Sequence, residues 1–311
     1  MRQLPLEEYA ALFADDSRPT GEFSLALAER GDTPLPRRSI RGHKYTFGRA
    51  LLAAGCRGYT GASVLAANAC ERSGAGLTQL LVPESIYPIA AARIDGAVVT
   101  PLASDATGGF SPEASDAFRA LLERADAACV GPGFGTGEGA SALAETALRH
   151  GECPLVVDAD ALRACAARPE VLDGYGAPVL LTPHEGEFRR LGGALDAGRL
   201  AGALDYTRRH PRVILILKGH GTLICRGNAA VVNPTGTPAM AKGGSGDVLS
   251  GVLTALLAQG FDAWVAARCA VYIHGLAGEI ADRKLGEYCV TPSDLIAALP
   301  EAFRAVTEAE V

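Results

Sequence analysis

The sequence lacks several features that would assign it to common classes of protein. It has no excess of basic residues, because 29 Lys and Arg stand against 35 Asp and Glu, which gives a formal charge of -6. A chain with this balance offers no uniformly basic face to a phosphodiester backbone, so nucleic acid is not an expected partner. It also contains no GxxxxGK[ST] segment, which excludes a P-loop nucleotidase.

Zinc-binding patterns, export signals and long apolar runs are missing as well. The eight cysteines include no CxxC pair, and no His-rich cluster has zinc-ligand spacing, so we expect reduced, mostly buried thiols. The acidic N-terminus, MRQLPLEEYAALFADD, lacks the basic start and apolar run of a signal peptide. The most apolar late stretch, Val248 to Ala281, is interrupted by Gln259, Asp262 and Arg268, so no membrane span is predicted. The expected location is the cytoplasm.

The length and composition favour one large domain. A chain of 311 residues with 48% hydrophobic content can bury a sizeable core without disulfides or metals. No internal repeat, low-complexity tract or charged linker divides it. Residues 1–40 are polar and contain proline, which predicts an N-terminal arm, and residues 41–311 form the predicted domain.

Short apolar runs, each followed by Gly or Asp and then a helical stretch, recur along the chain. They begin at Leu51, Leu77, Ala127, Pro154, Pro178 and Val213. Continuous runs of this kind are typical of parallel strands that helices cover on both faces. The apolar runs on either side of Arg226-Gly227-Asn228 predict a hairpin instead. We therefore predict an α/β fold with a mostly parallel sheet that ends in antiparallel strands.

The segment Lys242–Gly251, KGGSGDVLSG, opens an apolar helix and has the properties of an anion site. Its glycines allow successive N-H groups to point at one spot, where the helix dipole adds positive charge. Asp247 in the first turn is suited to deprotonate a hydroxyl while these N-H groups hold a migrating phosphoryl group. With an ordinary pKa of ~3.9 it would be ionised at neutral pH. The alternative is a plain helix start with a capping acid.

Further polar and glycine-rich segments follow the predicted strands, where ligands gather in open parallel sheets. They are His43-Lys44, Gly58–Ala62, Arg72–Leu77, Gly131–Gly135, Asp158–Leu162, Thr182–Glu187 and Lys218–Thr222. Gly131–Gly135 does not extend to GxGxxG, because Thr136 occupies the last glycine position, so a dinucleotide fingerprint is not indicated. Of the two acids in Asp158–Leu162, Asp160 is expected to cap and order its loop, and neither is expected to be catalytic.

In their order and spacing these segments and GSGD resemble the ADP/ATP-dependent NAD(P)H-hydrate dehydratase family, over roughly residues 40 to 300. The resemblance implies a ribokinase-like, three-layer α/β/α sandwich. It implies that ADP or ATP, with Mg²⁺, phosphorylates the ring hydroxyl of the S epimer of hydrated NADH or NADPH, after which phosphate is eliminated. NADH or NADPH is thereby restored.

The resemblance also implies a role for individual residues. Asp247 would be the catalytic base and would contact the substrate together with Ala62, Gly135 and His184. Gly244, Ser245 and Gly246 would form the anion hole. The adenine nucleotide would bind to Lys218, Gly219, His220, Gly221, Thr222 and Gly246. Glu187 would lie near magnesium, directly or through water, since Mg²⁺ keeps waters and phosphate oxygens as ligands.

Two departures from the family pattern concern substrate preference. Tyr45 and Cys56 stand where the family usually has Gly and Ser. Two other functions stay open: a ribokinase-like kinase for a vitamin or sugar alcohol, and a nucleotide-binding module without activity. The family often forms tetramers, so a homotetramer is expected, and bacterial-type members typically use ADP. The epimerase that acts on the same substrate pool would be a separate protein.

Overall fold

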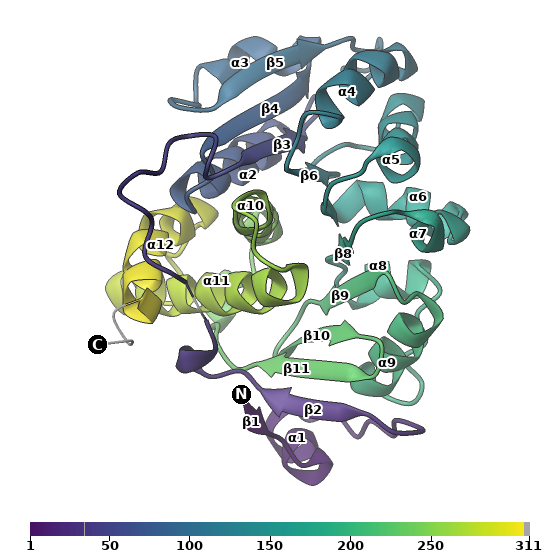
Figure 1. Ribbon diagram of the computed structural model, residues 1–311, viewed down its shortest axis with the longest axis vertical. Coiled ribbons are helices and arrows are strands. Elements are labelled where there is room, and N and C mark those ends of the chain that lie inside the picture. Colours follow the sequence, from purple (N-terminus) through teal and green to yellow (C-terminus); the bar gives the residue numbers. More distant parts are fainter. Residues whose placement is uncertain (34, 308–311) are drawn as a thin grey trace.

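The computed structural model describes residues 1–33 and 35–307, and in this part of the chain the strands form one sheet. From one edge to the other the order is β1-β2-β11-β10-β9-β8-β7-β6-β3-β4-β5 (Figure 1). The strands are β1 (Arg2–Gln3), β2 (Ser24–Leu27), β3 (Arg49–Ala53), β4 (Leu77–Pro83), β5 (Val98–Leu102), β6 (Ala127–Val130), β7 (Leu155–Val157), β8 (Val179–Leu181), β9 (Val213–Leu217), β10 (Thr222–Arg226) and β11 (Ala229–Asn233). The helices are α1 (Leu6–Phe13), α2 (Thr60–Arg72), α3 (Tyr87–Ala91), α4 (Ser115–Leu122), α5 (Glu138–His150), α6 (Leu162–Ala167), α7 (Glu170–Gly174), α8 (Glu185–Arg190), α9 (Arg199–Arg209), α10 (Ser245–Ala258), α11 (Ala263–Leu285) and α12 (Pro292–Thr307).

The centre of the sheet is parallel, as the apolar runs predict. Each of the six predicted runs contains a strand, and β3 to β9 pair only in parallel with one another. β10 pairs antiparallel with both β9 and β11, and the turn between β10 and β11 contains Gly227 and Asn228. The predicted hairpin and the change to antiparallel pairing are therefore confirmed.

Helices cover both faces of the sheet, and alternate strand residues enter two separate cores. Leu52 and Ile216 belong to the core under α2, α10, α11 and α12, whereas Leu51 and Leu215 belong to the core under the helices of the opposite layer (Figure 1). Strands buried on both faces need apolar residues at every position, which explains their continuous apolar sequences. The predicted three-layer sandwich is confirmed.

Helix α10 packs closely on α2. A Cβ at Gly251 would lie 2.2 Å from the carbonyl oxygen of Ala66, so only glycine permits this approach. The contact fixes α10 along the sheet. Its first turn consequently lies at the carboxyl ends of β7 and β9. A Cβ at Gly246 would lie 3.3 Å from Lys218 Nζ and 3.9 Å from the Asp158 carboxylate there.

The N-terminal segment extends the sheet. β2 pairs in parallel with β11, and β1 pairs antiparallel with β2. Asp15 then accepts hydrogen bonds from the N-H groups of Arg199 and Leu200 at 3.2 Å, at the start of α9. The segment predicted as an arm thus contributes two edge strands and a helix cap, while the domain boundary after residue 40 stays a prediction.

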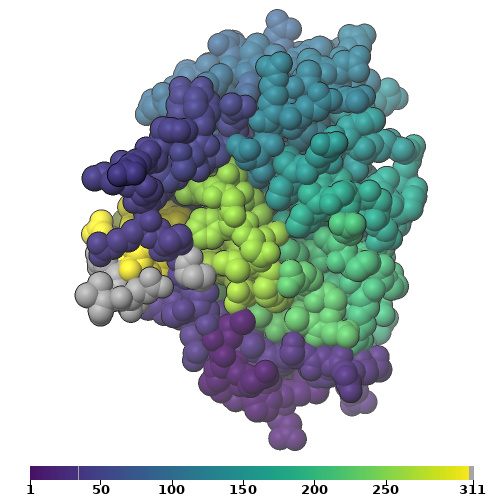
Figure 2. Space-filling model, in the orientation of Figure 1, coloured from purple at the N-terminus to yellow at the C-terminus, as the bar shows by residue number. Residues whose placement is uncertain are grey.

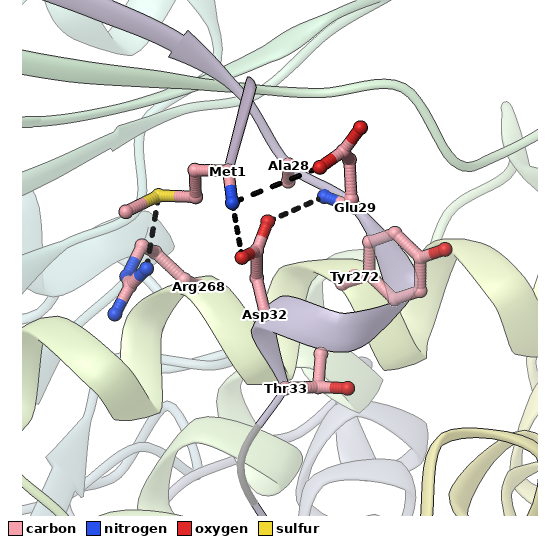
Figure 3. Close-up of a pocket in the computed structure, with 7 residues that line it drawn as sticks. All are labelled: Met1, Ala28, Glu29, Asp32, Thr33, Arg268 and Tyr272. Atoms are coloured by element: carbon pink, nitrogen blue, oxygen red, sulfur yellow. Dashed lines mark hydrogen bonds and ion pairs between the residues drawn. The ribbon is translucent and has the colours of Figure 1, made fainter. Parts of the chain in front are cut away.

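The first residue is held against α11. The N-terminal amine of Met1 bonds to Asp32 and lies 3.7 Å from Glu29, and Arg268 donates to the Met1 sulfur at 2.9 Å (Figure 3). The crevice between these residues has a volume of about 0 Å³. The contacts hold Met1 against α11, and the crevice leaves no room for a ligand.

Two further expectations concern the cysteines and the membrane. Seven cysteines are buried and Cys289 is exposed, and all eight are free thiols, as expected. Within residues 1–33 and 35–307, no helix has both the length and the apolar composition that a membrane crossing requires.

Candidate active site

The first residues of α10, directly after the glycine-rich segment, line a large cavity. Gly244 adopts a φ of +102°, and Ser245 begins the helix. Figure 2 shows the light-green α10 region at the surface, between the blue N-terminal third and the green loops. The cavity measures about 580 Å³, within the usual range for small-molecule sites. Its walls come from the loop after β9, the segment after β11, the start of α10, and α11.

All five residues of the predicted nucleotide loop line this cavity. The residues in its wall include Lys218, Gly219, His220, Gly221, Thr222, Asn233, Thr235, Thr237, Met240, Ser245, Gly246, Leu249, Val271, His274 and Gly275. The wall combines apolar side chains with hydroxyl, amide and ammonium groups, which suits a ligand with a flat apolar part and a charged part. The structure therefore brings the Lys218–Thr222 loop and Gly246 together, as the sequence predicts.

The loop after β9 is braced by Arg199 and by the N-terminal segment. Arg199 donates to the carbonyl oxygens of His220 at 2.7 Å and of Lys218 at 3.3 Å. A Cβ at Gly221, where φ is +60°, would lie 2.3 Å from the Phe13 ring. The backbone of the loop is thus held from both sides, which leaves its cavity-facing groups in place for a ligand.

Asp158 lies at the centre of a buried polar network behind this loop. It is 1% exposed, and one of its oxygens accepts from Lys218 Nζ at 3.0 Å and from Thr182 Oγ1 at 2.7 Å. The other oxygen accepts from Ser250 Oγ at 2.8 Å. Asp158, for which the sequence indicates no role, thus holds Lys218 in place.

The carboxylate and the lysine beside it have shifted pKa values. Burial and the charge of Asp158 raise the pKa of Asp247 to about 7, although Lys218 opposes the shift. The expectation of a fully ionised Asp247 is therefore wrong, because the sequence did not show the burial or the second carboxylate. Burial alone would lower the pKa of Lys218, but Asp158 and Glu187 outweigh it and raise that pKa, so the lysine is cationic.

Backbone donors are available at the start of α10. Gly246 and Asp247 lie in the first turn, where N-H groups have no acceptor inside the helix. The N-H of Ser245 is already used, since it donates to the carbonyl oxygen of Lys242 at 3.3 Å, and the Ser245 hydroxyl donates to the carbonyl oxygen of Met240 at 2.8 Å. Donors and dipole together make this turn a place for an anion.

Two of the predicted substrate residues, Ala62 and Gly135, lie beside or in the loop after β6. A Cβ at Gly133 would lie 2.8 Å from the Cβ of Ala62, so the loop after β6 rests on the first turn of α2. Gly135 N-H donates to Asp160 at 2.8 Å, so Asp160 orders the loop after β6, whereas the turn Ala159–Ala161 that contains it has no side-chain cap. A Cβ at Gly135 would lie 3.1 Å from the Cys56 sulfur. The departure at Cys56 therefore stands directly beside a predicted substrate residue.

His184 and Glu187 form a capping box at the start of α8. Nδ1 of His184 accepts from the N-H groups of Gly186 and Glu187, and the Glu187 carboxylate accepts from the N-H of His184 at 2.9 Å. The same carboxylate lies 3.9 Å from Lys218 Nζ. His184 is thus adjacent to the charged network, with its Nδ1 committed to the helix start.

Asp247 has charged neighbours in the walls of two cavities. Its electrostatic neighbours are Lys218, in the wall of the large cavity, and Asp160, in the wall of a second cavity of about 210 Å³ that Glu187 also lines. Neither cavity is lined by Asp247 itself or by Ala62, Gly135 or His184. The departure at Tyr45 is exposed, with its ring against His43 and Arg49.

The described residues contain no group of three His, Cys, Asp or Glu side chains placed to hold a metal. Both oxygens of Asp158 are hydrogen-bonded, while one oxygen of Glu187 accepts from the N-H of His184 at 2.9 Å and the other lies 3.5 Å from His184 Nε2. Carboxylates as few as these fit an ion such as Mg²⁺, because Mg²⁺ takes few protein carboxylates and completes its coordination shell with phosphate oxygens and water.

Comparison with known proteins gives consistent matches. The NAD(P)H-hydrate dehydratase family matches residues 50–301. A bifunctional NAD(P)H-hydrate repair enzyme Nnr from Moorella thermoacetica is 39% identical over 88% of this chain and 52% of its own length. An ADP-dependent (S)-NAD(P)H-hydrate dehydratase from Xanthomonas campestris is 33% identical over 81% of this chain and 86% of its own. The chain spans about half the length of the bifunctional relatives it matches.

Solved structures share the fold. An ADP/ATP-dependent NAD(P)H-hydrate dehydratase from Bacillus subtilis, co-crystallised with ATP and Mg²⁺, superposes with a TM-score of 0.78 at 29% identity, over 90% of this chain and 98% of that one. A ribokinase-like superfamily protein from Enterococcus faecalis also gives 0.78, at 27% identity over 91% and 96% of the two chains. The ribokinase-like fold predicted from the sequence is confirmed.

Proposed function

Because this chain belongs to the NAD(P)H-hydrate dehydratase family, we propose that it uses ADP or ATP to dehydrate the S form of hydrated NADH and NADPH. The observation that carries the proposal is the position of Asp247. It stands in the first turn of α10, directly after Gly246, which lines the 580 Å³ cavity, and the charges of Asp158, Lys218 and Asp160 all act on it. That is where a phosphoryl group passing from nucleotide to substrate would be transferred.

In the proposed reaction, Asp247 takes the proton of the ring hydroxyl while the hydroxyl oxygen bonds to the terminal phosphorus of the nucleotide. The bond between that phosphorus and the bridging oxygen breaks, and the shorter nucleotide leaves. The phosphorylated ring carbon then loses phosphate, and the neighbouring carbon loses a proton, which restores the ring double bond. Nucleotide cleavage thereby drives a dehydration that hydroxide is too poor a leaving group to allow.

The chain stabilises the transferred group through positioning and charge. We assign the anion hole to Gly244, Ser245 and Gly246, at the positive end of the α10 dipole. Lys218 is cationic and fixed by Asp158 at 3.0 Å, so it suits contact with phosphate without reorganisation. Mg²⁺, held near Glu187 mainly through water and phosphate oxygens, would neutralise further negative charge.

We assign the two ligands to the two sides of Asp247. The adenine nucleotide is assigned to the large cavity and its loop Lys218, Gly219, His220, Gly221 and Thr222, together with Gly246. The hydrated nicotinamide is assigned to Ala62, Gly135 and His184 on the other side. A cytoplasmic location, a homotetramer and a separate epimerase that supplies the S form complete the proposal.

The test mixes purified protein with S-form hydrated NADH, Mg²⁺ and either ADP or ATP, and follows the return of reduced-nicotinamide absorbance. Asp247→Ala is expected to lower kcat on the order of 10²- to 10⁴-fold, because it removes the base, while nucleotide affinity stays within a few-fold. Asp205→Ala, which removes an exposed carboxylate on α9, is the matched control and should leave kcat unchanged.

Two outcomes would contradict the proposal. Substantial turnover by the Asp247→Ala protein would show that another group is the base. Accumulation of a stable phosphorylated product, with no return of absorbance, would identify the chain as a kinase of the same superfamily.

A further inference from the structure

A second cavity opens between helices α6 and α8, beside the predicted substrate residues. It measures about 210 Å³, and its charged wall residues are Asp160, Arg163, Glu187 and Arg190. The two acids connect this wall to the substrate residues. Asp160 accepts from the N-H of Gly135 at 2.8 Å, and Glu187 accepts from the N-H of His184 at 2.9 Å. The cavity is thus one hydrogen bond away from each of two residues assigned to the hydrated nicotinamide.

The two carboxylates in the wall already have donors from the chain. Besides these backbone bonds, Glu187 lies 3.5 Å from His184 Nε2 and 3.9 Å from Lys218 Nζ. The two arginines have fewer partners. Within residues 1–33 and 35–307, the guanidinium of Arg163 has no hydrogen bond or ion pair, and Arg190 uses only Nε, which donates to the carbonyl oxygen of Gly186 at 3.3 Å. Both arginines are exposed, so a ligand that enters from solvent can reach the uncommitted positive charge of this wall.

The backbone at the edge of this cavity has an unusual conformation. Ala159 lines the cavity with a φ of +48°, a region that non-glycine residues rarely adopt. It separates two acids that have different partners, since Asp158 accepts from Lys218 in the buried network and Asp160 accepts from Gly135 at the cavity. Strained residues of this kind are concentrated at ligand sites, where the surrounding contacts hold them.

The proposed substrate contains an anion that matches this wall. Hydrated NADH and NADPH both carry a diphosphate, which one ribose separates from the nicotinamide ring. The cavity is also close to the reacting end of the substrate, because the charge of Asp160 helps to raise the pKa of Asp247. A guanidinium presents paired N-H donors in a planar fork, which fits phosphate oxygens. Two such groups in one cavity suit the two phosphates.

We propose that the cavity between α6 and α8 binds the diphosphate of the hydrated dinucleotide, and that Arg163 and Arg190 contact it. The inference rests on the proposed function and on the assignment of Gly135 and His184 to the nicotinamide end. NADH and NADPH share the diphosphate, so the two arginines contribute equally to the binding of both. The diphosphate takes no part in the chemistry, so its contacts lower KM and leave kcat unchanged.

The test measures KM and kcat for the S forms of hydrated NADH and hydrated NADPH, with saturating ADP and Mg²⁺. Arg163→Gln and Arg190→Gln are each expected to raise KM about tenfold for both substrates, while kcat changes by less than about twofold. Tenfold is near the lower end of what losing a hydrogen bond to a charged group costs, because both guanidiniums are exposed. Arg163→Lys and Arg190→Lys keep the charge without the fork and should recover part of the loss.

Arg189→Gln is the matched control. Arg189 is an exposed arginine on the same helix, α8, where it lies 3.8 Å from Glu185 and outside the cavity wall. Its replacement should leave KM unchanged for both substrates. The urea midpoints of all three glutamine variants should equal that of the original protein, because none of the arginines is buried.

Binding of the product separates this inference from the proposed function. Binding of NADH to the full chain, followed by reduced-nicotinamide fluorescence, needs no chemistry, and Arg163→Gln and Arg190→Gln should weaken it by a similar factor. Unchanged KM and NADH affinity in either variant would overturn the proposal. A loss confined to the NADPH form would overturn it too, since that result would place the 2′-phosphate in the cavity. A chain that binds NADH through these arginines but does not dehydrate hydrated NADH would refute the proposed function alone.

Discussion

At the scale of single residues, Asp247 determines how the proposed reaction depends on pH. Its pKa is raised to about 7 by burial and by the neighbouring Asp158, and a base must be ionised to accept a proton. We therefore expect kcat/KM to rise from pH 5.5 and to level off above about pH 8, with a midpoint near 7. A profile measured with saturating ADP checks this. A rate that is already maximal at pH 5.5 would contradict the assignment.

The same carboxyl should make the folded protein less stable as the pH rises. In the unfolded chain its pKa is near 3.8, so the folded state binds the proton more tightly. The contribution of this carboxyl to the free energy of unfolding is therefore fully present below about pH 4 and is lost as the pH rises through 7. Asp247→Asn stays neutral, so its stability relative to the original protein is expected to grow between about pH 4 and pH 7 and to stay higher above pH 7. Urea unfolding at pH 5 and pH 8 should show the larger gain at pH 8, and an equal difference at both would refute the burial of the charge.

The two site segments whose residues are consecutive could be predicted from the sequence, whereas the buried polar network around Asp158 could not. The glycine segment and the Lys218–Thr222 loop are recognisable because their residues are consecutive. Asp158 is different, since its partners Lys218 and Ser250 are distant in sequence and meet it only in the folded chain. The raised pKa of Asp247 has the same origin.

At the scale of elements, helix α9 depends on residues outside itself. Its N-cap residue, Gly198, has no side chain for capping, and Asp15 and Ser17 accept hydrogen bonds from the first N-H groups of the helix instead. The side chain of Arg199, in the same turn, donates a hydrogen bond to the backbone carbonyl oxygen of His220 in the Lys218–Thr222 loop. The start of α9 thus links the N-terminal segment to the proposed nucleotide site.

Removing the cap should affect both stability and nucleotide binding. Asp15→Ala is expected to lower the free energy of unfolding by about 1–2 kcal/mol, the usual cost of a lost helix cap. ADP should also bind more weakly, because Arg199 becomes less constrained. Urea unfolding and ADP calorimetry measure the two effects. Asp15→Asn keeps an acceptor oxygen and should lose less, and equal losses in both variants would argue against capping.

The strands that the sequence did not predict share one property. β2 and β5 include exposed positions, and β1 has two residues, so none forms a continuous apolar run. They lie at the two edges of the sheet, where helices cover less of each strand. The rule that recognises buried parallel strands therefore does not identify edge strands, which is also why residues 1–40 had the appearance of an arm.

At the scale of the whole molecule, the pairing of β2 with β11 joins segments that are far apart in time as well as in sequence. Ser24 lies opposite Ala229 in the completed sheet. At about 5–20 residues per second on the ribosome, roughly ten to forty seconds separate their synthesis. Strand β2 therefore has no partner on the side of β11 until residues 229–233 have been made.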